Sequence, residues 1–351
     1  MPHYLPDTAL TTLSVGNNVY TYAQTYDGIL VECQGQLKDV TDRTTRQVFR
    51  TTYSYRKQFE VLARYEDDEV PAGAPKLFTP LAAAYILSDR CLFYLDEDNV
   101  IRGVRSTNDP WAPETSLAAL NVHCAHYSQL TAITLSRNGF QAICLYYQNT
   151  DRDAGIEMLG LSTKNNTWVK GRPDMTPNPP PPQPAVRVVD PPLYGTSLTA
   201  VLARDGLRVI DGENSWLPVV YLQWDTLALA HSQDSQVETI RSLDLRFAPH
   251  TSLTAVDDGR NLYCFYTSSR NNSIRMVVVK DGKASAPQDI ATPTPRSSIA
   301  AVMPNNDRIV LFYQSLNADV GSVELNSITF VRGESSVAPW QASNARRAKL
   351  G

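Results

Sequence analysis

A recurring phrase constrains the fold of this chain more than any other feature of its sequence. Residues 297–315 read "SSIAAVMPNNDRIVLFYQS", residues 128–148 read "SQLTAITLSRNGFQAICLYYQ", and residues 251–266 read "TSLTAVDDGRNLYCFY". Each copy joins Ser or Thr, an aliphatic residue, small residues, a polar turn and a second apolar run that reaches Tyr. Repetition of this kind indicates an array of equivalent structural units, each too small to bury a core alone.

The phrase marks six units. Their aliphatic anchors are Leu10, Leu81, Leu130, Leu198, Leu253 and Ile299. Each interval between anchors leaves room for about four short antiparallel strands and their loops. Runs rich in Val, Ile, Leu, Tyr and Phe alternate with turn signals such as GNN, DDG and NND, which favours strands throughout. We therefore expect an all-β domain over residues 1–351, with six sheets arranged in a ring.

Two segments fall outside this pattern. Residues 172–192 contain the run "NPPPPQP", and proline fixes an extended backbone without donating to a sheet, so we expect a stiff connector there. Residues 341–351 form a polar tail that we expect to be frayed.

Composition excludes several classes of partner. The 32 basic and 36 acidic residues give a formal net charge of −4, and no Lys/Arg-rich block is present, which argues against nucleic acid and anionic membranes as partners. No apolar run is long enough for a transmembrane helix. Five cysteines without a CxxC spacing argue against zinc and leave at most two disulfides.

Localisation stays open at this point. The start "MPHYLPDTAL" lacks the charged and apolar regions of a signal peptide. Sequons at Asn165 and Asn271 would be accessible acceptors if a removed leader took the chain into the secretory pathway.

The second halves of the units carry a resemblance. The segments "VYTYAQTYDGILVE", "LFYLDEDNVIRGVRSTNDPW", "ICLYYQNTDRDAGIEMLGLSTKNNTW" and "LYCFYTSSRNNSIRMVV" resemble blades of the fungal fucose-specific lectin family, in which an aromatic strand, a polar turn, an Ile-Arg strand and a later Trp succeed one another. The resemblance implies a six-bladed β-propeller. It also implies fucose binding between blades, with Arg and Glu on the sugar hydroxyls and an aromatic ring on the apolar face.

The sugar-binding residues implied by the lectin resemblance are present in only some of the units. The residual lectin-like residues are Arg102, Arg275, Trp111 and Trp168. At the position of the two arginines the first unit has Leu30, the third has Glu157, and the fourth has no recognisable copy. Because a multivalent lectin gains avidity from several equivalent sites, this divergence weakens the case for one.

A second set of positions suggests a single site where the units meet on the axis. The residues just before the Ser or Thr of each unit are Asp7, Phe78, Tyr127, Gly195, His250 and Arg296, and one place earlier stand His126 and Tyr194. Ring symmetry would gather them around the channel mouth, where aromatic walls beside acids, bases and donors suit a small-molecule pocket. The alternative is that the two histidines merely cap loops. No carboxylate stands at ligand spacing from His126, so we expect no metal.

A single pocket on a degenerate lectin scaffold resembles the hetero-Diels-Alderases of tropolonic sesquiterpenoid biosynthesis, in length, repeat architecture and decay of the sugar sites. That resemblance implies a pericyclase of meroterpenoid biosynthesis, which needs no cofactor and joins an ortho-quinone methide to a humulene-type terpene. The catalytic residues would be Arg296 or Tyr194 as donors to oxygen and His126 or His250 for proton transfer. Asp7, Phe78 and Tyr127 would contact these apolar polyketide and terpenoid substrates.

Three functions follow from the sequence. The first is this cycloaddition enzyme, the second is a lectin for fucose or another glycan, and the third is an interaction propeller without chemistry.

Overall fold

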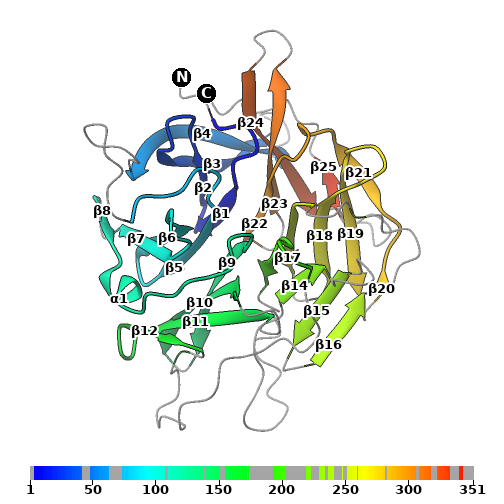
Figure 1. The fold of residues 1–351 in the computed structure, drawn as a ribbon. Helices are drawn as coiled ribbons and strands as arrows, with labels where there is room; N and C mark the ends of the chain where they lie inside the picture. The colour runs from blue at the N-terminus through cyan, green and yellow to red at the C-terminus, as the bar shows by residue number, and fades with distance from the viewer. Residues whose placement is uncertain are drawn as a thin grey trace.

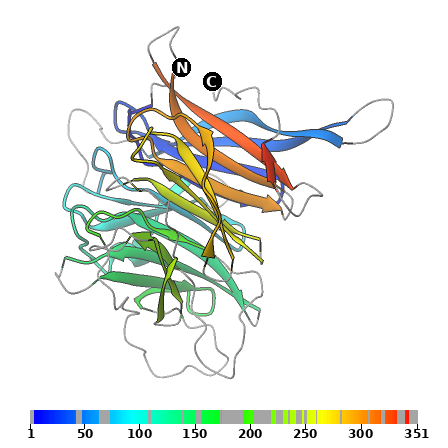
Figure 2. The same ribbon diagram turned by 90° about the vertical axis from the view of Figure 1, so that its right-hand side faces the viewer.

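The chain folds as an all-β propeller in a computed structural model. The structure describes residues 4–41, 48–62, 73–106, 110–137, 139–150, 155–171, 173, 193–201, 219–222, 229–233, 236–240, 247, 251–258, 260–280, 283–305, 308–317, 322–332 and 340–342. Over these residues the strands form six antiparallel sheets, here called blades 1 to 6 in chain order. The blades follow one another around a common centre (Figure 1), and their edges are seen in the turned view (Figure 2).

Four or five strands make up each blade. Blade 1 holds β1 (Thr11–Val15), β2 (Asn18–Gln24), β3 (Leu30–Thr41) and β4 (Val48–Leu62); blade 2 holds β5 (Ala82–Ile86), β6 (Asp89–Leu95), β7 (Ile101–Ser106) and β8 (Trp111–Pro113). Blade 3 holds β9 (Leu130–Arg137), β10 (Phe140–Gln148), β11 (Ile156–Ser162) and β12 (Thr167–Lys170); blade 4 holds β13 (Thr199–Ala200), β14 (Val219–Leu222), β15 (Leu229–Gln233) and β16 (Gln236–Ile240). Blade 5 holds β17 (Leu253–Asp257), β18 (Leu262–Thr267), β19 (Ile274–Lys280), β20 (Lys283–Ala284) and β21 (Gln288–Ala291); blade 6 holds β22 (Ile299–Asn305), β23 (Arg308–Asn317), β24 (Ser322–Arg332) and β25 (Trp340–Ala342). A short helix, α1 (Thr115–Ala118), follows β8.

The first strands of the blades close a ring. Each of β1, β5, β9, β13, β17 and β22 contacts the first strand of the next blade, and β22 contacts β1. The Nε2 of Gln314 in blade 6 donates to the carbonyl of Leu5 at the entry to blade 1, at 3.1 Å. Blade 6 and the entry to blade 1 therefore meet without a covalent link.

The Ser or Thr that opens each unit fixes the first strand against the second. Its hydroxyl accepts the backbone N–H at or just before the end of the second strand in five blades, in the pairs Thr8–Gln24, Thr79–Leu95, Ser128–Gln148, Thr251–Thr267 and Ser297–Gln314, over 2.7–3.0 Å. All five hydroxyl-bearing residues are buried. A buried hydroxyl must find such partners, which explains why this position is Ser or Thr in every copy.

A second set of hydroxyls joins neighbouring blades. The Thr after the anchor accepts the N–H of the small residue two places after the next anchor, in the pairs Thr131–Ala200, Thr199–Ala255 and Thr254–Ala301. Small residues let the backbones approach closely enough for these bonds. The bonds join equivalent positions, so the first strands of successive blades start at the same level.

Most of the sequence expectations agree with this fold. Each of the six anchors is buried and lies at, or one residue before, the start of a first strand. The connector at 172–192 lies outside the described residues apart from Pro173. Residues 341 and 342 of the expected frayed tail belong to β25, and the rest of that tail lies outside the described residues. Within the described part of the chain, no helix is long and apolar enough to span a membrane.

Replacing Thr79 by Val should destabilise the propeller. Thr79 is fully buried, and its hydroxyl accepts from the Leu95 N–H and donates to the Leu95 carbonyl. Because that carbonyl also accepts the Lys76 N–H, the change strands one buried backbone group, the Leu95 N–H. We expect a loss of about 1–3 kcal/mol in the free energy of unfolding, measured by urea denaturation. Thr79→Ser keeps the hydroxyl and should lose less than half as much. Equal losses in both variants would contradict the role given to this hydroxyl.

Stability should also fall at alkaline pH. None of the five cysteines forms a disulfide, and all are buried. Burial raises the pKa of Cys33 to about 11 and that of Cys91 to about 12, above an ordinary thiol value of 9.0. These groups therefore contribute stability that is complete below pH 9 and is lost as the pH rises through their folded-state values. We expect about 1 kcal/mol lost per thiol at pH 10.

The measurement is urea unfolding at pH 8 and pH 10. A Cys91→Ala variant should lose less stability between the two pH values than the unchanged protein. Identical stability of the unchanged protein at both pH values would contradict the prediction.

Candidate functional site

Charged and aromatic side chains meet at the boundary between blades 1 and 2. The hydroxyl of Tyr22 donates to Oε2 of Glu32 at 2.7 Å, and Nε of Arg90 donates to the same oxygen at 2.8 Å. The Arg90 guanidinium lies 4.7 Å from the ring centroid of Tyr20 and 5.5 Å from that of Trp111. These five residues are called the Glu32–Arg90 site.

Strand register explains how the site assembles. Tyr20 and Tyr22 are two residues apart on β2 and so face the same side, and Glu32 lies directly opposite Tyr22 on β3. On blade 2, Arg90 is opposite Ser106 of β7, which is opposite Trp111 of β8. Each blade therefore presents one row of side chains, and the two rows meet.

Burial divides the site into a closed interior and an accessible edge. The side chain of Glu32 is 1% exposed, whereas that of Arg90 is 17% exposed. Trp111 is partly exposed, and its ring meets that of Tyr22 edge-on at 6.0 Å. The carboxylate therefore lies inside, and the guanidinium and indole face the blade boundary. Such an edge offers charge-assisted donors beside an aromatic surface.

Electrostatics keep this arrangement intact over the physiological range. Burial, and then the neighbouring carboxylate of Glu32, raise the pKa of Tyr22 well above its ordinary value, so the phenol stays protonated and donates. Burial works against the charge of Arg90, but the interaction with Glu32 outweighs it and raises the pKa of Arg90. The site thus holds one anion and one cation, which compensate each other.

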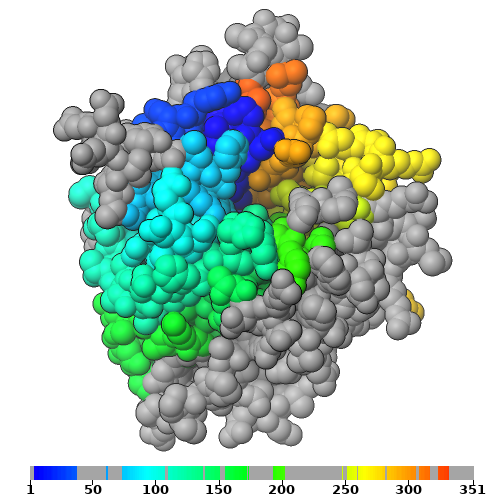
Figure 3. Space-filling model, viewed as in Figure 1, coloured from blue at the N-terminus to red at the C-terminus, as the bar shows by residue number. Residues whose placement is uncertain are grey.

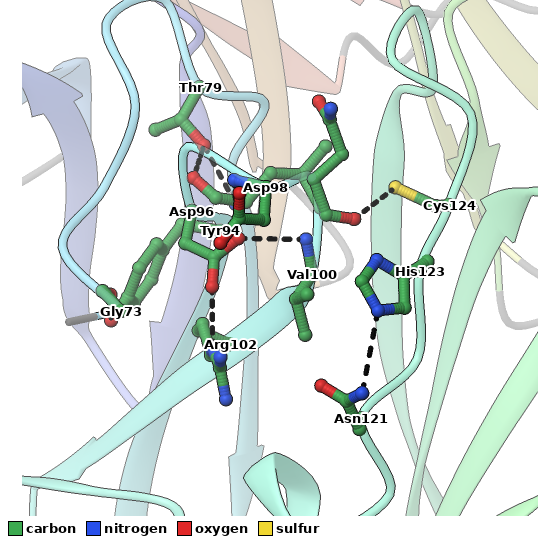
Figure 4. A network of polar contacts seen from close by, with 12 residues as sticks. Gly73, Thr79, Tyr94, Asp96, Asp98, Val100, Arg102, Asn121, His123 and Cys124 are labelled. Atoms are coloured by element: carbon green, nitrogen blue, oxygen red, sulfur yellow. Dashed lines mark hydrogen bonds and ion pairs between the residues drawn. The ribbon is translucent and has the colours of Figure 1, made fainter.

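Two further arginine–carboxylate pairs lie in blades 2 and 5, with their arginines at equivalent places. Nε of Arg102 donates to Asp96 Oδ2 at 2.8 Å (Figure 4), and Nε of Arg275 donates to Asp289 Oδ1 at 2.8 Å. Each arginine is opposite a tyrosine in the ladder, in the pairs Tyr94–Arg102 and Tyr266–Arg275. The two predicted arginines are therefore equivalent, and each already holds a carboxylate.

The equivalent position in the other described blades differs. The third blade has Glu157, as expected, and it accepts from the Tyr147 hydroxyl at 2.7 Å. In the first blade the ladder aligns Leu30 with the Ile before each arginine, so the equivalent residue is Val31 and not Leu30. The sequence comparison was one residue out of register there, although both residues are apolar.

The two predicted tryptophans differ in exposure. Trp168 is 1% exposed and packs edge-on against Phe93, with ring centroids 5.4 Å apart, in the core shared by blades 2 and 3. Its ring presents no face to a sugar. Trp111, by contrast, keeps part of its surface at a blade boundary.

The residues expected at the channel mouth occupy a set of turns before the first strands. In five blades the opening Ser or Thr closes the turn by donating its N–H to the carbonyl three residues earlier. Asp7, Phe78, Gly195 and Arg296 occupy the third place of these turns with positive φ. These turns and their side chains are called the turn rim.

Side chains of the turn rim gather in two groups. The rings of Tyr127 and Tyr194 lie 5.2 Å apart across the boundary of blades 3 and 4, and His126 meets Tyr127 edge-on at 5.0 Å. The second group is Asp7 and Arg296. Burial raises the pKa of Asp7, and the charge of Arg296 partly offsets that rise. His250 lies outside the described residues. Within the described ranges, no cluster of three or more His, Cys, Asp or Glu side chains is placed to hold a metal ion.

Comparisons with known proteins identify the fold. No protein-family model matches the sequence, and no curated protein does. The structure is similar to the six-bladed lectin of Aleuria aurantia, with a TM-score of 0.65 and 15% identity over 100% of this chain and 98% of that one. It is also similar to AofleA from Arthrobotrys oligospora, with a TM-score of 0.63 and 15% identity over 99% and 88% of the two chains. The SapL1 lectin, solved with α-methyl fucoside, gives a TM-score of 0.62 and 17% identity over 98% and 97%.

These likenesses show the fold of fungal fucose-specific lectins at low sequence identity. They support the first resemblance seen in the sequence and do not support the hetero-Diels-Alderase resemblance.

Sequence reasoning missed most of the Glu32–Arg90 site. Of its five residues only Trp111 was singled out, although Tyr20, Tyr22 and Glu32 all stood in a segment compared with the lectins. The sequence did contain one indication of this site, because Glu32 and Arg90 each stand inside an otherwise apolar strand run. A charge on a buried strand face requires a partner. Nothing in the linear sequence showed that the two partners come from neighbouring blades.

Removing the cation of this site should destabilise the protein strongly. Arg90→Met removes the ion pair between Arg90 and the buried carboxylate of Glu32, and breaking such a pair typically costs about 3–5 kcal/mol. Urea denaturation of Arg90→Met, Glu32→Gln and the double variant gives the coupling between the two residues. We expect the double variant to be more stable than Arg90→Met alone. A double variant in which the two single losses simply add would contradict the pairing.

Proposed function

We propose that this propeller binds glycans and that the Glu32–Arg90 site takes a fucose-type sugar at the boundary of blades 1 and 2. The proposal is carried by one observation: an arginine held by a buried carboxylate lies beside a partly exposed tryptophan between two blades of a lectin-like propeller. The guanidinium supplies directed donors for sugar hydroxyls, and the indole supplies an apolar face.

The similar structures support this choice of ligand. The Aleuria aurantia lectin is described by its fucose recognition, and SapL1 was solved with α-methyl fucoside. The Arg102 and Arg275 pairs are weaker candidates of the same kind, because among the described residues no tryptophan ring contacts either guanidinium. We therefore expect few sugar molecules to bind per chain, and the proposed binding does not depend on avidity from many equal sites.

The enzyme hypothesis has less support. A cycloaddition needs a concave pocket that encloses most of two apolar partners. The turn-rim residues assigned to it include Phe78 and Tyr194, which are 56% and 40% exposed. An open surface of this kind suits a ligand that keeps its polar groups in water.

Calorimetric titration with α-methyl fucoside tests the proposal. The unchanged protein should bind, and Trp111→Ala and Arg90→Lys should each weaken binding by roughly tenfold or more, about 1.4 kcal/mol, because each removes a contact with the sugar. Arg270→Met is the control, since Arg270 is an exposed arginine between β18 and β19 of blade 5, away from the site.

The control variant should bind like the unchanged protein. No binding of α-methyl fucoside to the unchanged protein, or full binding by both Trp111→Ala and Arg90→Lys, would contradict the proposal. Circular dichroism of each variant separates loss of the site from loss of the fold.

A further inference from the structure

Arg90 and Trp111 belong to one row of side chains that crosses three strands of blade 2. Ser106 of β7 is directly opposite Arg90 of β6 and directly opposite Trp111 of β8, so it stands between them in the row. Residues directly opposite one another in a sheet share a face, and the contacts of Arg90 with Tyr20 and Glu32 place this face against blade 1. Blades 1 and 2, dark blue and light blue in the space-filling view, adjoin one another (Figure 3). The group at position 106 therefore lies beside both residues proposed to contact the sugar.

The hydroxyl of Ser106 holds the guanidinium of Arg90. Nη2 of Arg90 donates to Oγ of Ser106 at 3.3 Å, while Nε of the same side chain donates to Oε2 of Glu32 at 2.8 Å. The two acceptors belong to different blades, and Ser106 and Glu32 are each 1% exposed. A planar guanidinium that is bound at two of its nitrogens cannot turn about its Nε–Cζ bond without losing one of these hydrogen bonds. Ser106 and Glu32 together therefore fix the direction in which Arg90 presents its donors.

The small size of Ser106 matters as much as its hydroxyl. Cζ of Arg90 lies 4.7 Å from the ring centroid of Tyr20 and 5.5 Å from that of Trp111, distances at which a guanidinium is attracted to an aromatic ring. Because Ser106 separates Arg90 from Trp111 in the row, a larger side chain there would stand between the guanidinium and the indole. Serine is the smallest residue that both leaves this space and accepts a hydrogen bond.

Blade 3 contains the same row with an apolar residue in place of Ser106. Arg90 and Ile143 are at the same distance in sequence from the N–H that the opening hydroxyl of their blade accepts. The row of blade 3 that starts at this position consists of Ile143, Leu161 and Trp168. Trp168 is 1% exposed and packs in the core, whereas Trp111 is partly exposed. A tryptophan thus ends both rows, and it stays accessible in the row that contains Arg and Ser.

We infer that Ser106 is a positioning residue of the Glu32–Arg90 site, which orients the Arg90 guanidinium for the hydroxyls of the sugar. Ser106 is too deeply buried to touch the sugar and acts through Arg90. The inference rests on the proposed binding of a fucose-type sugar. It adds the reason why the boundary of blades 1 and 2 can bind a sugar, while the equivalent row of blade 3 belongs to the core.

Nuclear magnetic resonance of the arginine side-chain nitrogens, in the protein without sugar, tests the orienting role. The Arg90 signals are identified as those missing from Arg90→Lys. Ser106→Ala should speed rotation of the Arg90 guanidinium about its Nε–Cζ bond by about threefold to tenfold, the factor that corresponds to one lost hydrogen bond. A role of Ser106 in packing alone would leave this rotation unchanged.

Calorimetric titration with α-methyl fucoside tests the consequence for binding. Ser106→Ala should weaken binding by about threefold to tenfold, because the donors of Arg90 are no longer held in one direction. Ser162→Ala is the matched control: Ser162 is 2% exposed, its hydroxyl accepts the Lys164 N–H at 3.2 Å, and it lies on β11 of blade 3. The control should match the unchanged protein in both affinity and rotation of Arg90. Circular dichroism of each variant checks that the fold is kept.

The two measurements separate this inference from the proposed function. Absence of fucoside binding by the unchanged protein contradicts the proposed function, and with it the sugar-binding part of the inference. Fucoside binding by the unchanged protein, combined with full affinity of Ser106→Ala, overturns the inference alone. Unaltered rotation of the Arg90 guanidinium in Ser106→Ala overturns it as well, whatever the affinity of that variant.

Discussion

The structure depends on buried hydroxyl groups of Ser and Thr at the start of each first strand. One set fixes the first strand to the second within a blade, as Thr79 does with Leu95, and another joins neighbouring blades, as Thr254 does with Ala301. Each bond satisfies a backbone group that would otherwise be buried unpaired. The bonds between blades link blades 3 to 6, and the Gln314–Leu5 bond joins blade 6 to blade 1.

A ring held together at its centre leaves its outer boundaries and its turns free to vary. The boundary of blades 1 and 2 carries Glu32, Arg90 and Trp111, while the boundary of blades 2 and 3 is filled by the buried pair Phe93–Trp168. The same architecture therefore gives a polar, partly open boundary in one place and an apolar core in the next. Ligand chemistry on such a scaffold has to be argued boundary by boundary.

The sequence predicted the architecture well because the groups that hold it recur. The anchors, the opening hydroxyl and the small residues are needed in every blade, so they repeat. The sites do not repeat, and this is why they were predicted poorly. Glu32 and Arg90 are 58 positions apart and meet only through the packing of two blades. Trp168 matched the lectin pattern in sequence, but its place in the Phe93 core depends on the neighbouring blade. The turn-rim positions could be listed from the sequence because they are counted from the repeat, although the count gave no indication that Phe78 and Tyr194 are exposed.

The central claim is that a lectin-like ring of six blades offers a sugar site where blade 1 meets blade 2. A crystal structure of the protein soaked with α-methyl fucoside tests it most directly. We expect six blades, with the sugar against Trp111 and its hydroxyls within hydrogen-bond distance of the Arg90 guanidinium. A ring with another number of blades, or a fucoside found only away from the boundary of blades 1 and 2, would contradict the account.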